Sequence, residues 1–181
     1  FVAEGYGLKR VEVMFNDFII VGPSNDPAGL RQAETGSQAL SKIAGTGLFF
    51  ISRGDLSGTH VKEMNLWELT DWDFNRVRSE PWYQESGQGM GATLNIAVNK
   101  PAYTLTDRGT WIRFENKSDL EILFEGSEEM FNPYSVILVN PEKHPHVNAV
   151  KGQVFIDWLI GEEGQQLIDS YRVNGQQLFF A

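Results

Sequence analysis

The chain has 181 residues, no cysteine, and 15 Lys and Arg against 24 Asp and Glu, which gives a formal net charge of −9. The length fits one large or two small domains, and a hydrophobic fraction of 41% is too high for a disordered chain. The lack of Cys excludes a disulfide scaffold, a Cys-ligated zinc site and a thiol nucleophile. The acidic balance argues against nucleic acid as a partner, because phosphates need a concentrated cationic surface.

Strand-like and helix-like segments alternate along the first half of the chain. Residues 13–21 are rich in strand formers and stop at Gly22-Pro23. Residues 28–44 are helix-forming but interrupted near residues 35–36, and the apolar run at 48–51 predicts a strand buried on both faces. A helix is predicted after the next polar loop. Its expected buried side carries Val61, Met64, Leu66 and Trp67.

The second half repeats this alternation and ends in a mainly helical third. Asp107 is a candidate N-cap for a short helix through Trp111, and Gly175 is the expected helix stop. The whole pattern indicates an α/β fold with mixed or parallel sheets. Further strands are predicted at residues 103–106, 120–124 and 134–139, and helices at 92–100, at 147–161 with Val150, Val154, Trp158 and Leu159 on one face, and at 162–173 with Leu167, Ile168 and Tyr171.

Two loops share one physical design, in which a strand-like segment runs into Gly and Ser residues that open a helix. They cover residues 52–59 and 87–93. The N–H groups of a helix's first turn lack intrahelical partners and carry partial positive charge, which suits an anion. The first loop adds the hydroxyls of Ser57 and Thr59 and the guanidinium of Arg53. Together the loops predict a site for a small tetrahedral oxyanion.

The same residues also have a purely structural interpretation. Gly-rich turns are common in α/β folds, and Arg53 would then pair with Asp55 or another carboxylate. His60 either approaches a bound anion or caps the helix. His144-Pro145-His146 has no third ligand type nearby, so a surface loop is favoured over a metal site. No Ser/His/Asp set or carboxylate pair stands at a catalytic spacing, so no enzyme is predicted.

Three segments carry a family resemblance: MFNDFIIVGP at residues 14–23, SRGDLSGTH at 52–60 and GQGMG at 87–91. Residues 102–110 and the tail around residues 164–166 extend it. In this combination the chain resembles the tungstate-binding protein family of ABC importers. The resemblance implies a type II periplasmic-binding-protein fold, in which two α/β lobes are joined by two hinge strands and clamp an oxyanion. Members deliver tungstate, sometimes molybdate, to a membrane permease.

The resemblance also implies a set of binding residues in the two loops. Arg53 and Thr59 would bind the ligand, and backbone N–H groups near Met90 and Gly91 would face them. The implied oxyanion-binding residues are Arg53, Ser57, Gly58, Thr59, Met90 and Gly91. No cofactor and no direct cation ligand are implied.

The implied domain organisation places the hinge strands at 15–21 and 135–139. Residues 1–22 would lead from lobe 1 into the first hinge, and 23–133 would form lobe 2. Residues 134–181 would hold the return hinge strand and the C-terminal helices of lobe 1.

One departure from the family pattern concerns the beginning of the chain. The family normally begins with a further lobe-half that carries a Thr/Ser-rich anion loop, and this chain starts shortly before the first hinge strand. The first half of one lobe is therefore expected to be missing. Either the chain is truncated, or a second copy completes the lobe as a strand-exchanged dimer. Because Phe1 is not Met, a fragment or a mature form is expected.

The leading functional expectation is a periplasmic or extracytoplasmic solute-binding protein that captures tungstate or molybdate for an ABC permease. The alternative is a cytoplasmic oxyanion-sensing domain of a regulator with the same fold. An enzyme on this scaffold would have only His60 as a nearby base. The net charge of −9 does not oppose anion binding, since surface carboxylates beyond about 8–10 Å are largely screened. Tungstate and molybdate have nearly the same size, shape and charge, so the sequence does not separate them.

Overall fold

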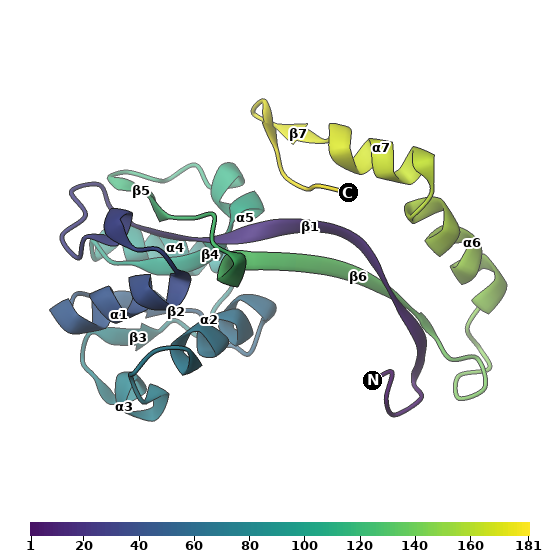
Figure 1. Ribbon diagram of the computed structural model, residues 1–181, viewed down its shortest axis with the longest axis horizontal. Coiled ribbons are helices and arrows are strands. Elements are labelled where there is room, and N and C mark those ends of the chain that lie inside the picture. Colours follow the sequence, from purple (N-terminus) through teal and green to yellow (C-terminus); the bar gives the residue numbers. More distant parts are fainter. The chain divides into compact units, whose positions relative to one another are not determined.

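The computed structural model describes residues 1–181 and divides into two compact units (Figure 1). Unit 1 comprises residues 1–16 and 132–181, and unit 2 comprises residues 17–131. The chain passes from one unit to the other inside β1 (Gly7–Pro23) and again at the start of β6 (Phe131–Val139), and these two strands pair. Both predicted hinge segments lie within these strands. The assignment of 1–22, 23–133 and 134–181 to lobes stays a prediction.

Unit 2 is a mixed α/β body. Its larger sheet has the antiparallel order β4-β1-β5, while β2 and β3 pair in parallel and bring Phe50 opposite Tyr83. Mixed sheets are what the alternating pattern predicts. The remaining elements of the unit are η1 (Leu30–Gln32), α1 (Gly36–Thr46), β2 (Phe50–Ser52), α2 (Gly58–Glu68), α3 (Phe74–Ser79), β3 (Tyr83–Glu85), α4 (Met90–Asn99), β4 (Thr104–Asp107), α5 (Arg108–Arg113), β5 (Leu120–Phe124) and η2 (Glu128–Met130).

Local sequence explains where these elements begin. Thr35 caps α1, which is why the predicted helix of residues 28–44 breaks at that point. Asp107 caps α5, as predicted, by accepting a 2.8 Å hydrogen bond from the Thr110 amide. Strand β2 is buried on both faces, as predicted, but it covers Phe50–Ser52 rather than 48–51, and Phe49 is 42% exposed. None of the helices is long and apolar enough to cross a bilayer.

The buried face of α2 differs from the prediction. Val61 is 42% exposed and Met64 is half-buried, while Leu66 and Trp67 are buried as expected. The core side of the helix is instead a stripe at positions i, i+4, i+7 and i+8 that starts at Thr59 and includes Glu63. The prediction missed this face because it counted apolar residues alone, and one buried position of the face is the polar Glu63.

Two predicted helix boundaries are also wrong. Helix α4 begins at Met90 rather than at residue 92, because Gly89 serves as its N-cap. Helix α7 (Glu162–Ser170) ends before residue 173, and Gly175 does not stop it. Asn174 and Gly175 have φ of +52° and +78° and form the turn between β7 (Arg172–Val173) and β8 (Gln176–Gln177), the usual Asn-Gly hairpin turn.

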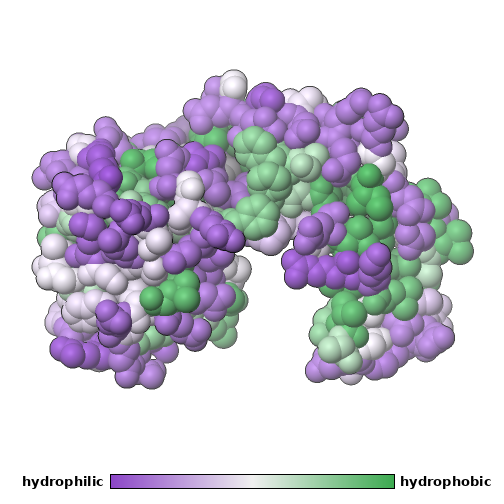
Figure 2. Space-filling view, in the orientation of Figure 1, coloured by the Kyte–Doolittle hydropathy of each residue, from purple (hydrophilic) through white to green (hydrophobic).

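Unit 1 leaves much apolar surface uncovered. Helix α6 (Ala149–Leu159) buries only Ile156, and Val150, Val154 and Trp158, predicted to share a face, are 78%, 64% and 40% exposed. Figure 2 shows hydrophobic residues at the surface of the part that carries this helix. Exposed apolar patches of this kind mark interaction surfaces or a tendency to associate. The predicted apolar face therefore exists, but nothing in unit 1 covers it.

Candidate functional site

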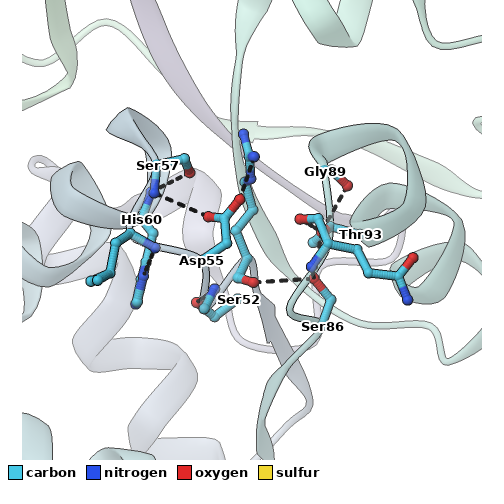
Figure 3. A network of polar contacts seen from close by, with 11 residues as sticks. Ser52, Asp55, Ser57, His60, Ser86, Gly89 and Thr93 are labelled. Carbon is cyan, nitrogen blue, oxygen red and sulfur yellow. Dashed lines mark hydrogen bonds and ion pairs between the residues drawn. The ribbon is translucent and has the colours of Figure 1, made fainter.

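Strands β2 and β3 bring the two predicted loops together within unit 2. The Ser86 amide donates to the Ser52 carbonyl and the Gly87 amide to the Arg53 carbonyl, each at 2.9 Å. Because parallel strands end at the same edge of a sheet, α2 and α4 both start from this edge (Figure 3). The two loops inferred from the sequence thus begin side by side, joined by main-chain hydrogen bonds.

The helix starts present backbone donors. Ser57 caps α2 by accepting from the His60 amide at 3.4 Å, while the cap of α4 is Gly89, which has no side chain to offer. The amides of Gly58 and Thr59 on α2, and of Met90 and Gly91 on α4, have no acceptor in the protein. Four N–H groups and two helix-dipole termini are therefore available to an anion.

Several glycines at these helix starts are not required by the fold. A Cβ added at Gly58, Gly89 or Gly91 would meet nothing within 4 Å, and none of the three has a positive φ. Gly54 is different, since its φ is +62° and its Cβ would lie 2.6 Å from Cβ of Glu85. The open space above the helix starts therefore suits a ligand that approaches the backbone closely.

Arg53 and Asp55 form an ion pair next to the α2 start. The distance between Arg53 Nη2 and Asp55 Oδ2 is 2.5 Å, so the pairing expected from the purely structural interpretation is present. Hydrogen bonds from Ser57, and the adjacent Arg53, lower the pKa of Asp55 to about 2. Arg53 Nε, however, is buried without any hydrogen-bond partner. An unsatisfied buried donor costs about 1–3 kcal/mol, which an oxyanion acceptor would offset.

His60 fixes the shape of the first loop. Its buried ring accepts a 3.0 Å hydrogen bond at Nδ1 from the Leu56 amide, so this nitrogen carries no proton. Leu56 has a φ of +58°, a left-handed conformation that costs a non-glycine residue on the order of 1 kcal/mol. The side chain that caps the helix is that of Ser57, so His60 does not cap it, and its approach to a bound anion stays a prediction.

Two residues that hold the second loop were missed from the sequence. The hydroxyls of Ser86 and Thr93 lie 2.7 Å apart, and the Gln88 amide donates to Ser86 Oγ at 3.2 Å (Figure 3). A serine directly before a glycine-rich segment is typical of such a side-chain turn, and this signal was available in the sequence.

The sequence analysis also missed Glu63, a buried residue of α2. It is 1% exposed and accepts hydrogen bonds from Ser52 Oγ at 2.7 Å, from the Tyr83 hydroxyl at 2.6 Å and from Trp67 Nε1 at 3.3 Å. Burial raises the pKa of the Glu63 carboxyl to about 7 despite these three donors. Its spacing of four residues from Thr59 puts both on one helix face, but nothing in the sequence indicates that this face is buried.

No group of three or more His, Asp and Glu side chains gathers as a candidate cation site. The rings of His144 and His146 contact each other, with centroids 6.0 Å apart. The donor set described above, backbone amides and one guanidinium, suits an anion and not a metal cation.

Comparison with known proteins agrees with this chemistry. The family model of the PBP superfamily domain matches residues 1–163. The tungstate-binding protein TupA of Peptoclostridium acidaminophilum is 43% identical over 173 residues, which cover 94% of this chain and 59% of that protein. The structure of the tungstate-binding protein TupA from Desulfovibrio alaskensis G20 matches with a TM-score of 0.87 and 41% identity, over 99% of this chain and 72% of the other.

The chain belongs to the tungstate-binding protein family of the PBP superfamily. A further member, the tungstate ABC transporter structure from Geobacter sulfurreducens, is 49% identical with a TM-score of 0.82, over 94% of this chain and 71% of the other. The predicted family and fold class are thereby confirmed. The chain spans about half to two thirds of the length of the curated relatives that it matches, at 53%, 59% and 66%. The roles of the six predicted binding residues in this family member stay predictions.

Proposed function

We propose that this chain is the oxyanion-binding part of a solute-binding protein that captures tungstate or molybdate for uptake through an ABC permease. The protein would act outside the cytoplasm and catalyse no reaction. Membership of the tungstate-binding protein family supports this function. The observation that carries it is the pair of adjoining helix starts with four unpaired amides beside the unsatisfied Arg53 Nε.

The six predicted residues divide the work of binding in this proposal. The amides of Gly58, Thr59, Met90 and Gly91 donate to the oxygens of a tetrahedral dianion, and Arg53 supplies the charge. Ser57 keeps its hydroxyl on the α2 cap and shapes the start of that helix. Neutral dipoles fixed by helices need no reorganisation when the ligand arrives, which favours affinity in a desolvated cleft.

Calorimetric titration with tungstate, molybdate and sulfate tests the function directly. Heat that saturates at one oxyanion per chain is the expected result. The absence of heat from all three ions would show that the paired helix starts are ordinary turns.

Two glycine substitutions separate a ligand role from a structural one. Gly58→Ala and Gly91→Ala place a methyl group in the open space above the helix starts. Each should weaken oxyanion binding roughly ten- to a hundredfold, the equivalent of one charge-assisted hydrogen bond, without lowering the melting temperature. The melting temperature should not fall, because alanine in a helix is more favourable than glycine by up to about 1 kcal/mol.

The matched control is Gly45→Ala. Gly45 lies in α1, and an added Cβ there also meets nothing within 4 Å. This variant should show the same small effect on the melting temperature and unchanged binding. Equal affinity in all three variants would contradict a ligand above the helix starts.

We also propose the predicted strand-exchanged dimer, in which a second copy completes the lobe and covers the exposed face of α6. The exposed Val150, Val154 and Trp158 support an association driven by apolar burial. Sedimentation velocity at increasing concentration should show a dimer or larger species. Val154→Glu should weaken the association roughly tenfold, since it removes about one apolar contact and buries a charge.

Val61→Glu is the control for this experiment. Val61 is also an exposed valine on a helix, but it lies on α2 of unit 2. A monomer at all concentrations, or an equal effect of both substitutions, would argue against association through α6.

A further inference from the structure

Glu63 joins the elements from which the two loops start. It lies on α2, and its carboxylate accepts from Ser52 at the end of β2 and from Tyr83 at the beginning of β3. Ser52 Oγ in turn accepts a 3.2 Å hydrogen bond from the Gly54 amide, inside the first loop. One buried carboxyl therefore connects the helix, both strands and the loop that carries Arg53.

The same carboxyl lies close to the place where an oxyanion would bind. Thr59 and Glu63 are four residues apart on α2 and both are buried, so they are neighbours on one helix face with Cβ atoms about 5–6 Å apart. A dianion at the amide of Thr59 and a carboxylate at Glu63 would repel each other through the protein interior, where screening by salt is weak.

We propose that Glu63 is a proton-linked positioning residue of this site, which holds the two loops together and takes up a proton from solvent when the site takes up an oxyanion. This inference rests on the proposed function. Since the unloaded carboxyl has a pKa of about 7, it is partly ionised near neutral pH, and a nearby dianion would favour its neutral form. By linkage, oxyanion affinity then falls by up to tenfold per pH unit above about pH 7.

The other charged groups around Glu63 do not replace this effect. Tyr83 is one of the three donors to Glu63. Burial raises the pKa of the Tyr83 hydroxyl far above the neutral range, so the hydroxyl stays protonated. Asp55 stays ionised because its pKa is about 2, and Glu85, which adds to the raised pKa of Glu63, is paired with Arg78 at 2.9 Å.

His60 is the one histidine on α2 and lies near the same helix start. It is present in both the wild type and a Glu63 variant. A comparison of the two therefore isolates the contribution of Glu63.

The experiment is calorimetric titration of the intact protein with tungstate at about pH 8, in several buffers of different ionisation enthalpy at equal ionic strength. The dependence of the observed heat on the buffer gives the number of protons taken up. The wild type should take up a substantial fraction of one proton. Glu63→Gln should take up almost none, because an amide does not titrate in this range. The fold should be kept, since the amide oxygen can accept from Tyr83 and Trp67 and the amide nitrogen can donate to Ser52 Oγ.

A second variant, Tyr83→Phe, keeps the proposal testable if Glu63→Gln does not fold. Tyr83→Phe keeps the ring that stacks on Phe50 but removes one donor to the carboxylate, so Glu63 should be protonated more readily before the ligand binds. The pH of greatest proton uptake should therefore move upward.

Each outcome decides the proposal. Binding by the wild type without proton uptake, equal uptake in Glu63→Gln, or an unmoved profile in Tyr83→Phe would overturn the role of Glu63 and leave the oxyanion function standing. The absence of oxyanion binding in the wild type at every pH would overturn both.

Discussion

Replacement of Arg53 by alanine is expected to weaken oxyanion binding by roughly 10²–10³-fold and to change the melting temperature very little. The guanidinium is the one cation at the helix starts, and its Nε has no partner in the protein. Hydrogen bonds to charged groups contribute about 1.5–3 kcal/mol each, so the loss of two at the lower end of this range, about 3–4 kcal/mol, gives a change of this size. Stability should be nearly unaffected, because the Arg53 head group pairs only with the partly exposed Asp55.

Titration calorimetry with tungstate and thermal unfolding measure the two effects separately. Arg53→Lys should recover part of the affinity, since a single ammonium replaces the charge but not the forked geometry. Arg76→Ala removes an exposed arginine that pairs with Glu80 four residues away, and it should change neither quantity. Lowered stability with unchanged anion affinity would instead assign Arg53 to the structure of the loop.

The free energy of unfolding should fall as pH rises from about 4.5 to about 7, through the titration of Glu63. Its folded-state pKa, about 7, is raised above the ordinary value of 4.5, so the folded protein binds more protons than the unfolded chain between these values. Stability is therefore fully present below the lower value and is lost as the buried carboxyl ionises. In Glu63→Gln this contribution is absent. The stability difference between variant and wild type should change by on the order of 3 kcal/mol across this window.

Denaturant unfolding at several pH values measures that change. Glu68→Gln is the matched control, because Glu68 is an exposed glutamate on the same helix. Its stability difference from the wild type should be nearly constant with pH. A constant difference for Glu63→Gln as well would show that the carboxyl is not desolvated in the folded protein.

Local chemistry made much of the fold predictable. Asp107 correctly indicated the start of α5, and the bounds of β5 were predicted without error. Both depend only on residues that are close in the sequence. The two loops were found for the same reason. Their strand-to-helix design is written in a few consecutive residues, and parallel pairing of the strands before them then brings them to one edge.

Features that depend on distant partners could not be obtained in this way. The buried position of Glu63 requires Tyr83, which lies 20 residues away on another strand. A glutamate that is charged in solution gives no hint of such a partner, so the stripe on α2 was counted from apolar residues and Val61 was placed inside. The exposure of α6 could not be predicted either. Its apolar pattern indicates a face that is buried against something, but the pattern does not identify the segment that covers it.

The parallel pairing of β2 with β3 also fixes the backbone part of the proposed binding site. Both strands end at the same edge of their sheet, so main-chain hydrogen bonds fix the backbone from which α2 and α4 start. In the proposed site, an oxyanion would therefore be bound mainly by main-chain groups rather than by adaptable side chains. Exchange of side chains around this edge would then change the strength of binding but not the positions of the backbone donors.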